Sequence, residues 1–134
     1  MPTTKEETII DMSFIPKYKT LKEVISDQKL AALGDAYINF IYSVAQSQKR
    51  KTPSGTKVSN QVLARALRKA ELRSFLPNRS DRHKQSNAAE ALIVYAWIQK
   101  AITIAESICI LQSKEEEVEN FAALLHTTKS RLNL

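Results

Sequence analysis

Two acidic residues stand alone in apolar stretches of the sequence. Asp35 is the only charged residue in LAALGDAYINFIYSVAQSQ, and Glu90 is the only charged residue in QSNAAEALIVYAWIQ. An ionised carboxylate in apolar surroundings costs several kcal/mol unless it is paired, protonated or bound to a cation. Each of these two acids therefore needs a partner.

Two kinds of partner fit these acids. Either acid could pair with an arginine, which is a structural role, or both could bind one cation. Carboxylate oxygens are the hard ligands that Mg²⁺ prefers, and Mg²⁺ completes its shell with water and substrate phosphate. Bound Mg²⁺ can activate water and neutralise charge on a phosphodiester. The sequence offers no candidate nucleophile, so we interpret Asp35 and Glu90 as catalytic metal ligands that meet in space.

Two polar residues share a helical stripe with Glu90. His83, Asn87 and Glu90 are spaced four and then three apart, which places their side chains on one face of a helix. Asn87 is therefore a candidate third ligand through its amide oxygen. For His83 a phosphate contact or a surface position is favoured over metal ligation.

Positive charge is concentrated in one part of the chain. The net charge is +6, but residues 45–84 alone carry +9, so the rest of the chain is acidic. This basic block favours a polyanion such as RNA as partner, although a solvated surface that aids solubility remains an equal alternative. Its members are Lys49, Arg50, Lys51, Lys57, Arg65, Arg68, Lys69, Arg73, Arg79, Arg82 and Lys84.

Helices must position these residues. Apolar residues recur at helical spacing over residues 27–46, with Ser26 or Asp27 as cap, and again after the cap Ser59 until Leu76-Pro77-Asn78. A third helix is predicted from Ser80 or Ser86 to about Leu111, apolar nearly all round over residues 88–98 as in a central helix. Residues 114–132 form a last helix with acids in its first turn. We expect an all-α fold.

Length and composition limit the architecture and the environment. The 134 residues fit one domain over residues 20–134, preceded by an arm, residues 1–19, whose structure is not readable. Cys109 lies between Ile108 and Ile110, which predicts a buried free thiol in a reducing compartment. No secretory signal and no apolar run long enough for a bilayer is visible. We therefore expect a cytoplasmic protein without membrane contact.

The segments that hold the two acids resemble the ribonuclease III catalytic domain. Leu33, Gly34, Asp35 and Ala36 are similar to the core of that family's signature helix, and the run from Glu90 to Ile93 is similar to its second acidic helix. The order, a separation of about 55 residues and the intervening basic helix also agree, over residues 30–98. The short chain is most similar to the compact Mini-III type, which lacks a double-stranded-RNA-binding domain.

The resemblance implies a homodimer whose signature helices pack across the two-fold axis, with duplex RNA in a groove that spans both sites. Each site would hydrolyse one strand with Mg²⁺, or Mn²⁺ as substitute, and leave 5′-phosphate and 3′-hydroxyl ends. Asp35 and Glu90 would be catalytic residues and metal ligands, joined by Asn87. The basic block would supply the phosphate contacts, and with His83 these are Lys57, Arg65, Arg68, Arg79, Arg82, His83 and Lys84.

Two positions depart from the pattern of the larger enzymes. Ala31 and Asn87 stand where those enzymes carry acids, although the Mini-III type also lacks the first. Two alternatives to the nuclease therefore stay open: a weakly active or inactive module that binds structured RNA, and a helical domain that binds an acidic protein. Only the nuclease cuts RNA with a divalent metal, and the protein-binding domain has no salt-dependent RNA affinity.

Overall fold

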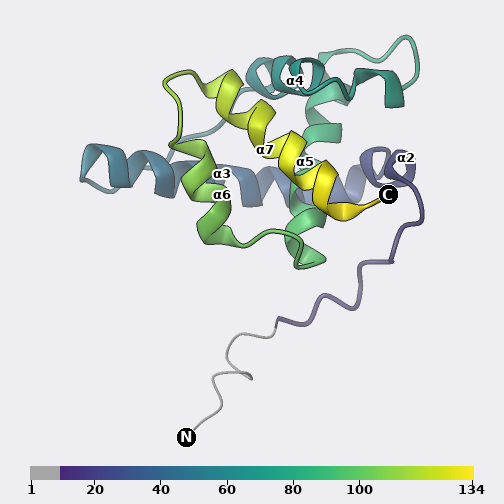
Figure 1. Ribbon diagram of the computed structural model, residues 1–134, viewed down its shortest axis with the longest axis horizontal. Coiled ribbons are helices and arrows are strands. Elements are labelled where there is room, and N and C mark those ends of the chain that lie inside the picture. The colour runs from purple at the N-terminus through teal and green to yellow at the C-terminus, as the bar shows by residue number, and fades with distance from the viewer. Residues whose placement is uncertain (1–9) are drawn as a thin grey trace, which may run out of the picture.

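The computed structural model describes residues 10–134, and within them every regular element is a helix (Figure 1). This confirms the all-α prediction. The first nine residues of the expected arm lie outside the described part of the chain. The elements are α2 (Leu21–Ile25), α3 (Gln28–Arg50), α4 (Asn60–Lys69), the 3₁₀ turn η1 (Arg73–Phe75), α5 (Arg82–Ile98), α6 (Ile104–Leu111) and α7 (Glu117–Leu132).

Helix α5 is the centre of the fold. It contacts α2, α3, α4 and α7, and Figure 1 shows it crossing behind α7 with α3 running across it. Every residue from Ala88 to Ala96 is buried. A helix without a polar face is stable only when other helices surround it, so the sequence prediction of a central helix over residues 88–98 is confirmed.

Local capping explains where most of the helices begin. Asp27 caps α3 by accepting hydrogen bonds from the backbone N–H groups of Lys29 and Leu30, each at 3.0 Å. Ser59 and Asp81 cap α4 and α5 in the same manner. These side chains satisfy N–H groups that have no partner within the helix. They fix the starting points of the two helices that carry the isolated acids.

The predicted third helix is wrong beyond residue 98, because α5 and α6 are separate helices. Lys100 has a positive φ of 63°, which ends the first helix. Thr103 then starts the second with a capping box, in which its hydroxyl accepts from the Glu106 N–H and the Glu106 carboxylate accepts from the Thr103 N–H. The turn also rotates Cys109 outward, so the thiol is exposed and the prediction that it is buried is wrong.

Two other helix ends differ from the prediction. Helix α3 runs four residues further than expected, to Arg50, and stops where Lys51 takes a left-handed conformation. Helix α4 ends at Lys69 because Glu71 has a positive φ of 63°, well before Pro77. Within residues 10–134 no helix combines the length and the apolar character that crossing a membrane requires.

Helices α3 and α5 touch at Gly34. A Cβ atom added to Gly34 would lie 2.1 Å from the carbonyl oxygen of Glu90 and 2.5 Å from its carbonyl carbon. Both atoms belong to the backbone of a buried helix, so neither can move aside alone. The absence of a side chain at residue 34 therefore allows the two backbones to meet at the residue pair that carries the isolated acids.

We expect Gly34→Ala to destabilise the protein by about 3 kcal/mol or to prevent folding, because the added methyl group forces α3 and α5 apart. Chemical denaturation measures the loss. Gly55→Ala is the matched control, since a Cβ at Gly55 meets no atom within 4 Å and its φ is not positive. Equal stabilities of the two variants would contradict the close approach of the helices.

Candidate active site

Asp35 and Glu90 lie side by side on α3 and α5, with their carboxyl groups within hydrogen-bonding reach of each other. They open into one pocket of about 390 Å³, which has room for a hydrated divalent ion and a phosphate group. The convergence expected from the sequence is therefore present in the fold. The pocket is lined by Gln28, Ala31, Ala32, Asp35, Lys57, Asn60, His83, Asn87 and Glu90.

The two carboxyl groups have different environments. Glu90 is 4% exposed, whereas the side chain of Asp35 is 43% exposed. Burial, together with the hydrogen bond to Asp35 and its negative charge, raises the pKa of Glu90 to about 8. Burial also raises the pKa of Asp35, but the hydrogen bond from Glu90 and the interaction with Lys57 outweigh it and lower that pKa below its usual value. The metal-free pair therefore holds one proton at neutral pH, on Glu90.

Asp35 has a cationic partner, and it is a lysine. The ammonium nitrogen of Lys57 lies 3.3 Å from Oδ1 of Asp35. Among residues 10–134 neither isolated acid forms an ion pair with an arginine. The structural alternative of two separate arginine pairs is therefore wrong. Asn39 donates a further hydrogen bond of 3.1 Å to the same oxygen of Asp35.

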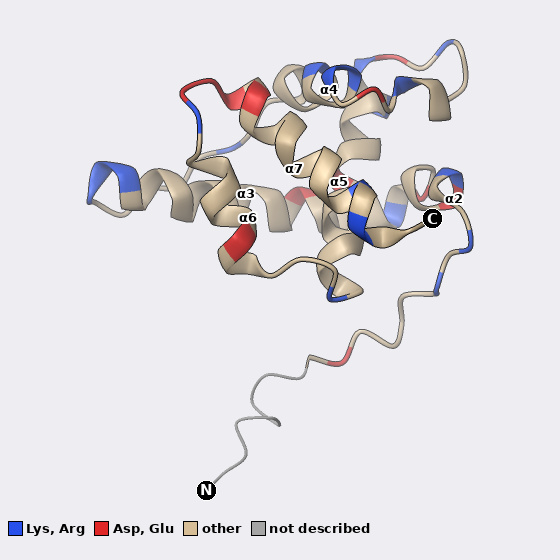
Figure 2. Ribbon diagram, viewed as in Figure 1, with Lys and Arg blue, Asp and Glu red and all other residues tan. Residues whose placement is uncertain are grey.

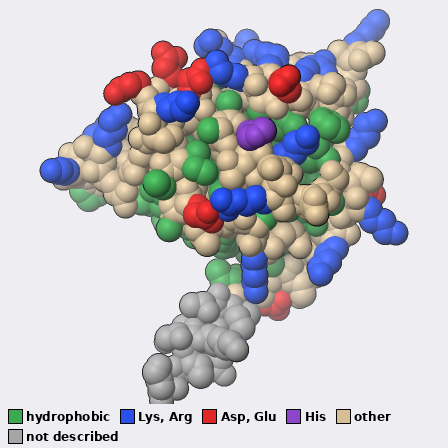
Figure 3. Space-filling view, in the orientation of Figure 1, with side chains coloured by type: hydrophobic (Ala, Val, Ile, Leu, Met, Phe, Trp, Pro, Cys, Tyr) green, Lys and Arg blue, Asp and Glu red, His purple; other side chains and the backbone are tan. Residues whose placement is uncertain are grey.

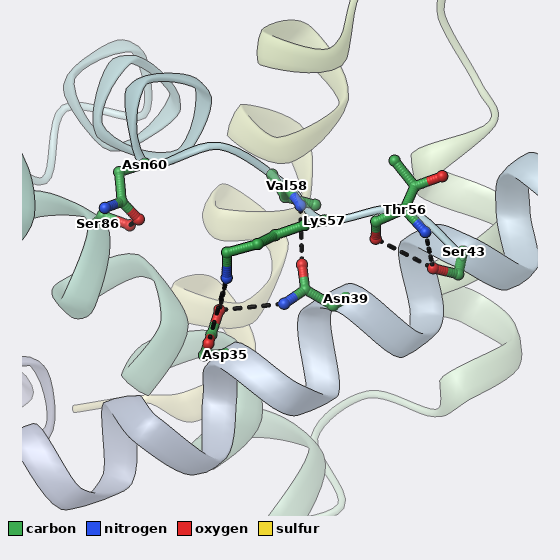
Figure 4. Close-up of polar contacts among 8 residues, drawn as sticks. All are labelled: Asp35, Asn39, Ser43, Thr56, Lys57, Val58, Asn60 and Ser86. Carbon is green, nitrogen blue, oxygen red and sulfur yellow. Dashed lines mark hydrogen bonds and ion pairs between the residues drawn. The ribbon is translucent and has the colours of Figure 1, made fainter.

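A polar stripe on α3 holds the loop that carries Lys57 (Figure 4). The stripe consists of Asp35, Asn39, Ser43 and Ser47, each four residues from the next. The Asn39 amide oxygen accepts from the Val58 N–H at 2.8 Å, and the Ser43 hydroxyl oxygen accepts from the Thr56 N–H at 2.8 Å. Ser47 accepts similarly from the Ser54 N–H at 2.9 Å. The sequence analysis missed this stripe, although its four-residue spacing is visible in the sequence.

The donor set around the two acids fits one hard cation. The described residues contain no group of three or more His, Cys, Asp and Glu side chains that could hold a metal. The pocket does hold two carboxylates and the amide of Asn87, and Mg²⁺ accepts such oxygens together with water. Since the carboxyl groups of Asp35 and Glu90 line the same pocket, one divalent ion could contact both of them.

The other polar residues of the pocket differ in their surroundings. Asn87 lines both this pocket and a second one, which lies beside it and includes Lys84 and Ser80. Asn60 accepts a hydrogen bond of 3.0 Å from the hydroxyl of buried Ser86, which fixes the start of α4 against α5. His83 is exposed at the rim of the site pocket. These contacts set the position of the pocket walls.

The other basic residues named in the sequence analysis do not line the pocket. Arg65, Arg79 and Arg82 are exposed, and Arg68 donates a hydrogen bond of 2.8 Å to the buried Gln85 amide oxygen. The ribbon of Figure 2 shows basic residues concentrated along α4 and acidic residues at the start of α7, and in Figure 3 their side chains gather over the same regions. Lys69 and Glu119 form an ion pair between these two regions. Asn60, the first residue of α4, lines the pocket, so α4 links the basic surface to the pocket wall.

The raised pKa of Glu90 predicts a pH-dependent stability in metal-free buffer. The unfolded chain loses the Glu90 proton near pH 4.5, whereas the folded protein keeps it until about pH 8. The folded state therefore binds more protons within this window, and stability falls as the pH rises through it, by a few kcal/mol in order of magnitude. Thermal or denaturant unfolding with a chelator present, at pH 5 and at pH 8, measures this change.

Glu90→Gln is the matched variant, because its amide carries no titratable proton. The difference in stability between wild type and variant should move in favour of the variant as the pH rises from 5 to 8. A difference that stays constant over this range would contradict the buried, protonated state of Glu90.

Comparison with protein families gave one match. The family model described as Ribonuclease III matches residues 28–131, which is most of the chain and includes both isolated acids. A search of the curated proteins found no match. The matched range covers α3 to α7 almost completely, so it agrees with the resemblance that the two acidic segments indicate. The chain belongs to the ribonuclease III family, a family of ribonucleases.

Proposed function

We propose that this protein is a metal-dependent endoribonuclease that hydrolyses double-stranded or structured RNA, with Asp35 and Glu90 as catalytic metal ligands. The observation that carries the proposal is the convergence of these two carboxyl groups in one pocket between α3 and α5. Membership of the ribonuclease III family supports the same chemistry. We propose that the protein acts on this substrate in the cytoplasm.

Mg²⁺, with Mn²⁺ as substitute, is the proposed cofactor. When bound, the ion supplies an activated water and neutralises charge on the phosphodiester. Asp35 and Glu90 hold it in the ionised state, and the Asn87 amide oxygen completes the protein part of the shell. The ends left by hydrolysis are a 5′-phosphate and a 3′-hydroxyl.

Binding of the RNA depends on the basic surface beside the pocket. A-form duplexes are recognised through the phosphate backbone and the shape of the helix, and exposed cations near the pocket suit that mode of recognition. We propose that six residues of the basic block make the phosphate contacts together with His83. They are Lys57, Arg65, Arg68, Arg79, Arg82, His83 and Lys84.

We expect the purified protein to fragment a long RNA duplex in Mg²⁺ or Mn²⁺, and we expect a chelator to stop the reaction. Asp35→Asn and Glu90→Gln should each slow cleavage by at least about 100-fold, because even residues that only orient metal ligands contribute 10- to 100-fold. Duplex affinity should stay within roughly threefold, since phosphate contacts dominate it. Gel analysis of the products and a filter-binding titration measure both quantities.

One outcome would favour the alternative function. Ala31 and Asn87 are neutral residues in the pocket wall, so the site holds fewer charges than the larger enzymes provide. If the duplex is bound with salt-dependent affinity and stays intact in both metals, the protein is an RNA-binding module without nuclease activity. If it neither binds nor cuts RNA, the nuclease proposal fails altogether.

We also propose that two copies pair through the outer face of α3. Phe40 is 58% exposed there, beside exposed Ala36 and half-buried Val44. Phe40 and Val44 line a shallow apolar hollow together with Pro53. A second copy is the occupant that the family resemblance implies, and this face begins next to Asp35, so pairing would place two sites on one assembly.

Phe40→Glu should convert the dimer to a monomer, because it places a charge in an apolar contact. Light scattering coupled to size-exclusion chromatography measures the mass directly. Leu134→Glu, which adds the same charge to another exposed apolar residue, is the control and should leave the mass unchanged. A wild-type protein that is monomeric at micromolar concentration would contradict the pairing.

A further inference from the structure

We propose that Lys57 is a further catalytic residue of the site, whose ammonium group contacts the phosphoryl group during hydrolysis. The inference rests on the proposed nuclease function and adds a role to a residue otherwise assigned only to general phosphate binding. Three observations support this proposal. They are the balance of charges in the pocket, the fixed position of the loop that carries Lys57, and the contacts that other basic residues make elsewhere in the fold.

The charges in the pocket match one divalent ion and one lysine. Asp35 and Glu90 supply two negative charges when both are ionised. The other polar residues of the pocket are His83 at the rim and three neutral amides, which are Asn87, Asn60 and Gln28. A second divalent ion would have no further carboxylate to bind. Phosphodiester hydrolysis nevertheless concentrates negative charge on the phosphoryl oxygens, and a fixed cation at that place stabilises it. Lys57 is the one lysine or arginine among the residues that line the pocket.

The backbone around Lys57 is held firmly against α3, although the side chain of Lys57 is exposed. Its neighbours in sequence, Thr56 and Val58, are both fastened to α3 through backbone N–H groups, by Ser43 and Asn39 respectively. Val58 is also buried, at 2% exposure. Asn39 joins the two parts of the site, because its amide oxygen holds the Val58 N–H while its amide nitrogen holds Asp35 (Figure 4). Asn39 is thus a positioning residue for Lys57 and for Asp35 at once.

Other members of the basic block are engaged elsewhere. Arg68 is bonded to Gln85, Lys69 is paired with Glu119, and Arg73 donates to the carbonyl oxygens of residues 76–78. The ammonium of Lys57, by contrast, reaches over the pocket to Asp35 and is held there by one exposed ion pair. Since an exposed ion pair contributes little to stability, the ammonium can leave Asp35 for a phosphate oxygen at little cost.

The proposed step conserves atoms and charge. A water oxygen forms a bond to phosphorus as the bond from phosphorus to the 3′ oxygen breaks, and the bonding electron pair goes to that oxygen. The water gives up one proton to solvent, and the 3′ oxygen takes one proton from solvent to become a hydroxyl. Lys57 stays protonated throughout and donates hydrogen bonds to a non-bridging phosphoryl oxygen, on which the negative charge increases.

Lys57→Met tests the proposal with two readouts that move in opposite directions. Calorimetric titration with Mn²⁺, without RNA, should show roughly 5- to 20-fold tighter binding, because the variant removes a positive charge that competes for Asp35. Single-turnover cleavage of an RNA duplex in saturating Mn²⁺ should slow by about 100-fold. Lys57→Arg keeps the charge and should retain part of the rate.

Lys49→Met is the matched control. Lys49 is an exposed lysine in the last turn of α3 and does not line the pocket, so both readouts should stay at the wild-type values. The melting temperature of Lys57→Met should also stay within a few degrees of wild type, since only an exposed pair is lost.

The failures of the two proposals can be told apart. A wild-type protein that leaves the duplex intact in Mn²⁺ overturns the nuclease function and the role of Lys57 with it. If the wild type cuts the duplex and Lys57→Met cuts it at the same rate, only the role of Lys57 is overturned. Weaker Mn²⁺ binding and a lower melting temperature in Lys57→Met would show a structural lysine and would also overturn it.

Discussion

The direct contact of two helix backbones at Gly34 and Glu90 is the constraint on which the site depends. Packed helices ordinarily keep their axes 8–10 Å apart, at a distance set by the side chains between them. With no Cβ at residue 34, α3 reaches the carbonyl group of Glu90 itself. The next residue along α3 is Asp35, so the contact that sets the distance between the helices also sets the separation of the two carboxyl groups. The acids are therefore held by rigid elements, and loops contribute only Lys57.

Placing two carboxyl groups side by side destabilises the fold at the point where the proposed chemistry takes place. Burial in the central helix raises the pKa of Glu90, and the hydrogen bond to Asp35 and the negative charge of Asp35 raise it further. In the proposed function a proton and a divalent ion would compete for the same carboxyl oxygens, so binding of the metal would release the proton of Glu90. Lys57 reduces the repulsion on the open side, where Asp35 remains in contact with water.

The sequence was sufficient to predict the parts of this site that depend on short-range pattern. Apolar spacing predicted α3, α4 and α7, and isolation in an apolar run identified Asp35 and Glu90. It failed where the outcome depends on distant parts of the chain. The break between α5 and α6 lies in an apolar run, and only Lys100 and the Thr103 capping box reveal it. The polar stripe from Asp35 to Ser47 resembles a solvated helix face until the loop packs on it.

A count of charges treats every lysine and arginine in the basic block as equivalent. The structure divides them into residues bonded within the fold, exposed residues, and Lys57 beside the two acids. Lys69 is paired with Glu119, which offsets its charge, whereas Arg68 and Arg73 keep their charge while their guanidinium groups donate hydrogen bonds within the fold. Arg65, Arg79 and Arg82 are exposed, and in the proposed function their charge would act on RNA affinity through counterion release. Lys57 alone is directed at the acids. In the proposed function, affinity for RNA and the rate of cleavage therefore depend on different members of the same block, and the net charge does not distinguish these members.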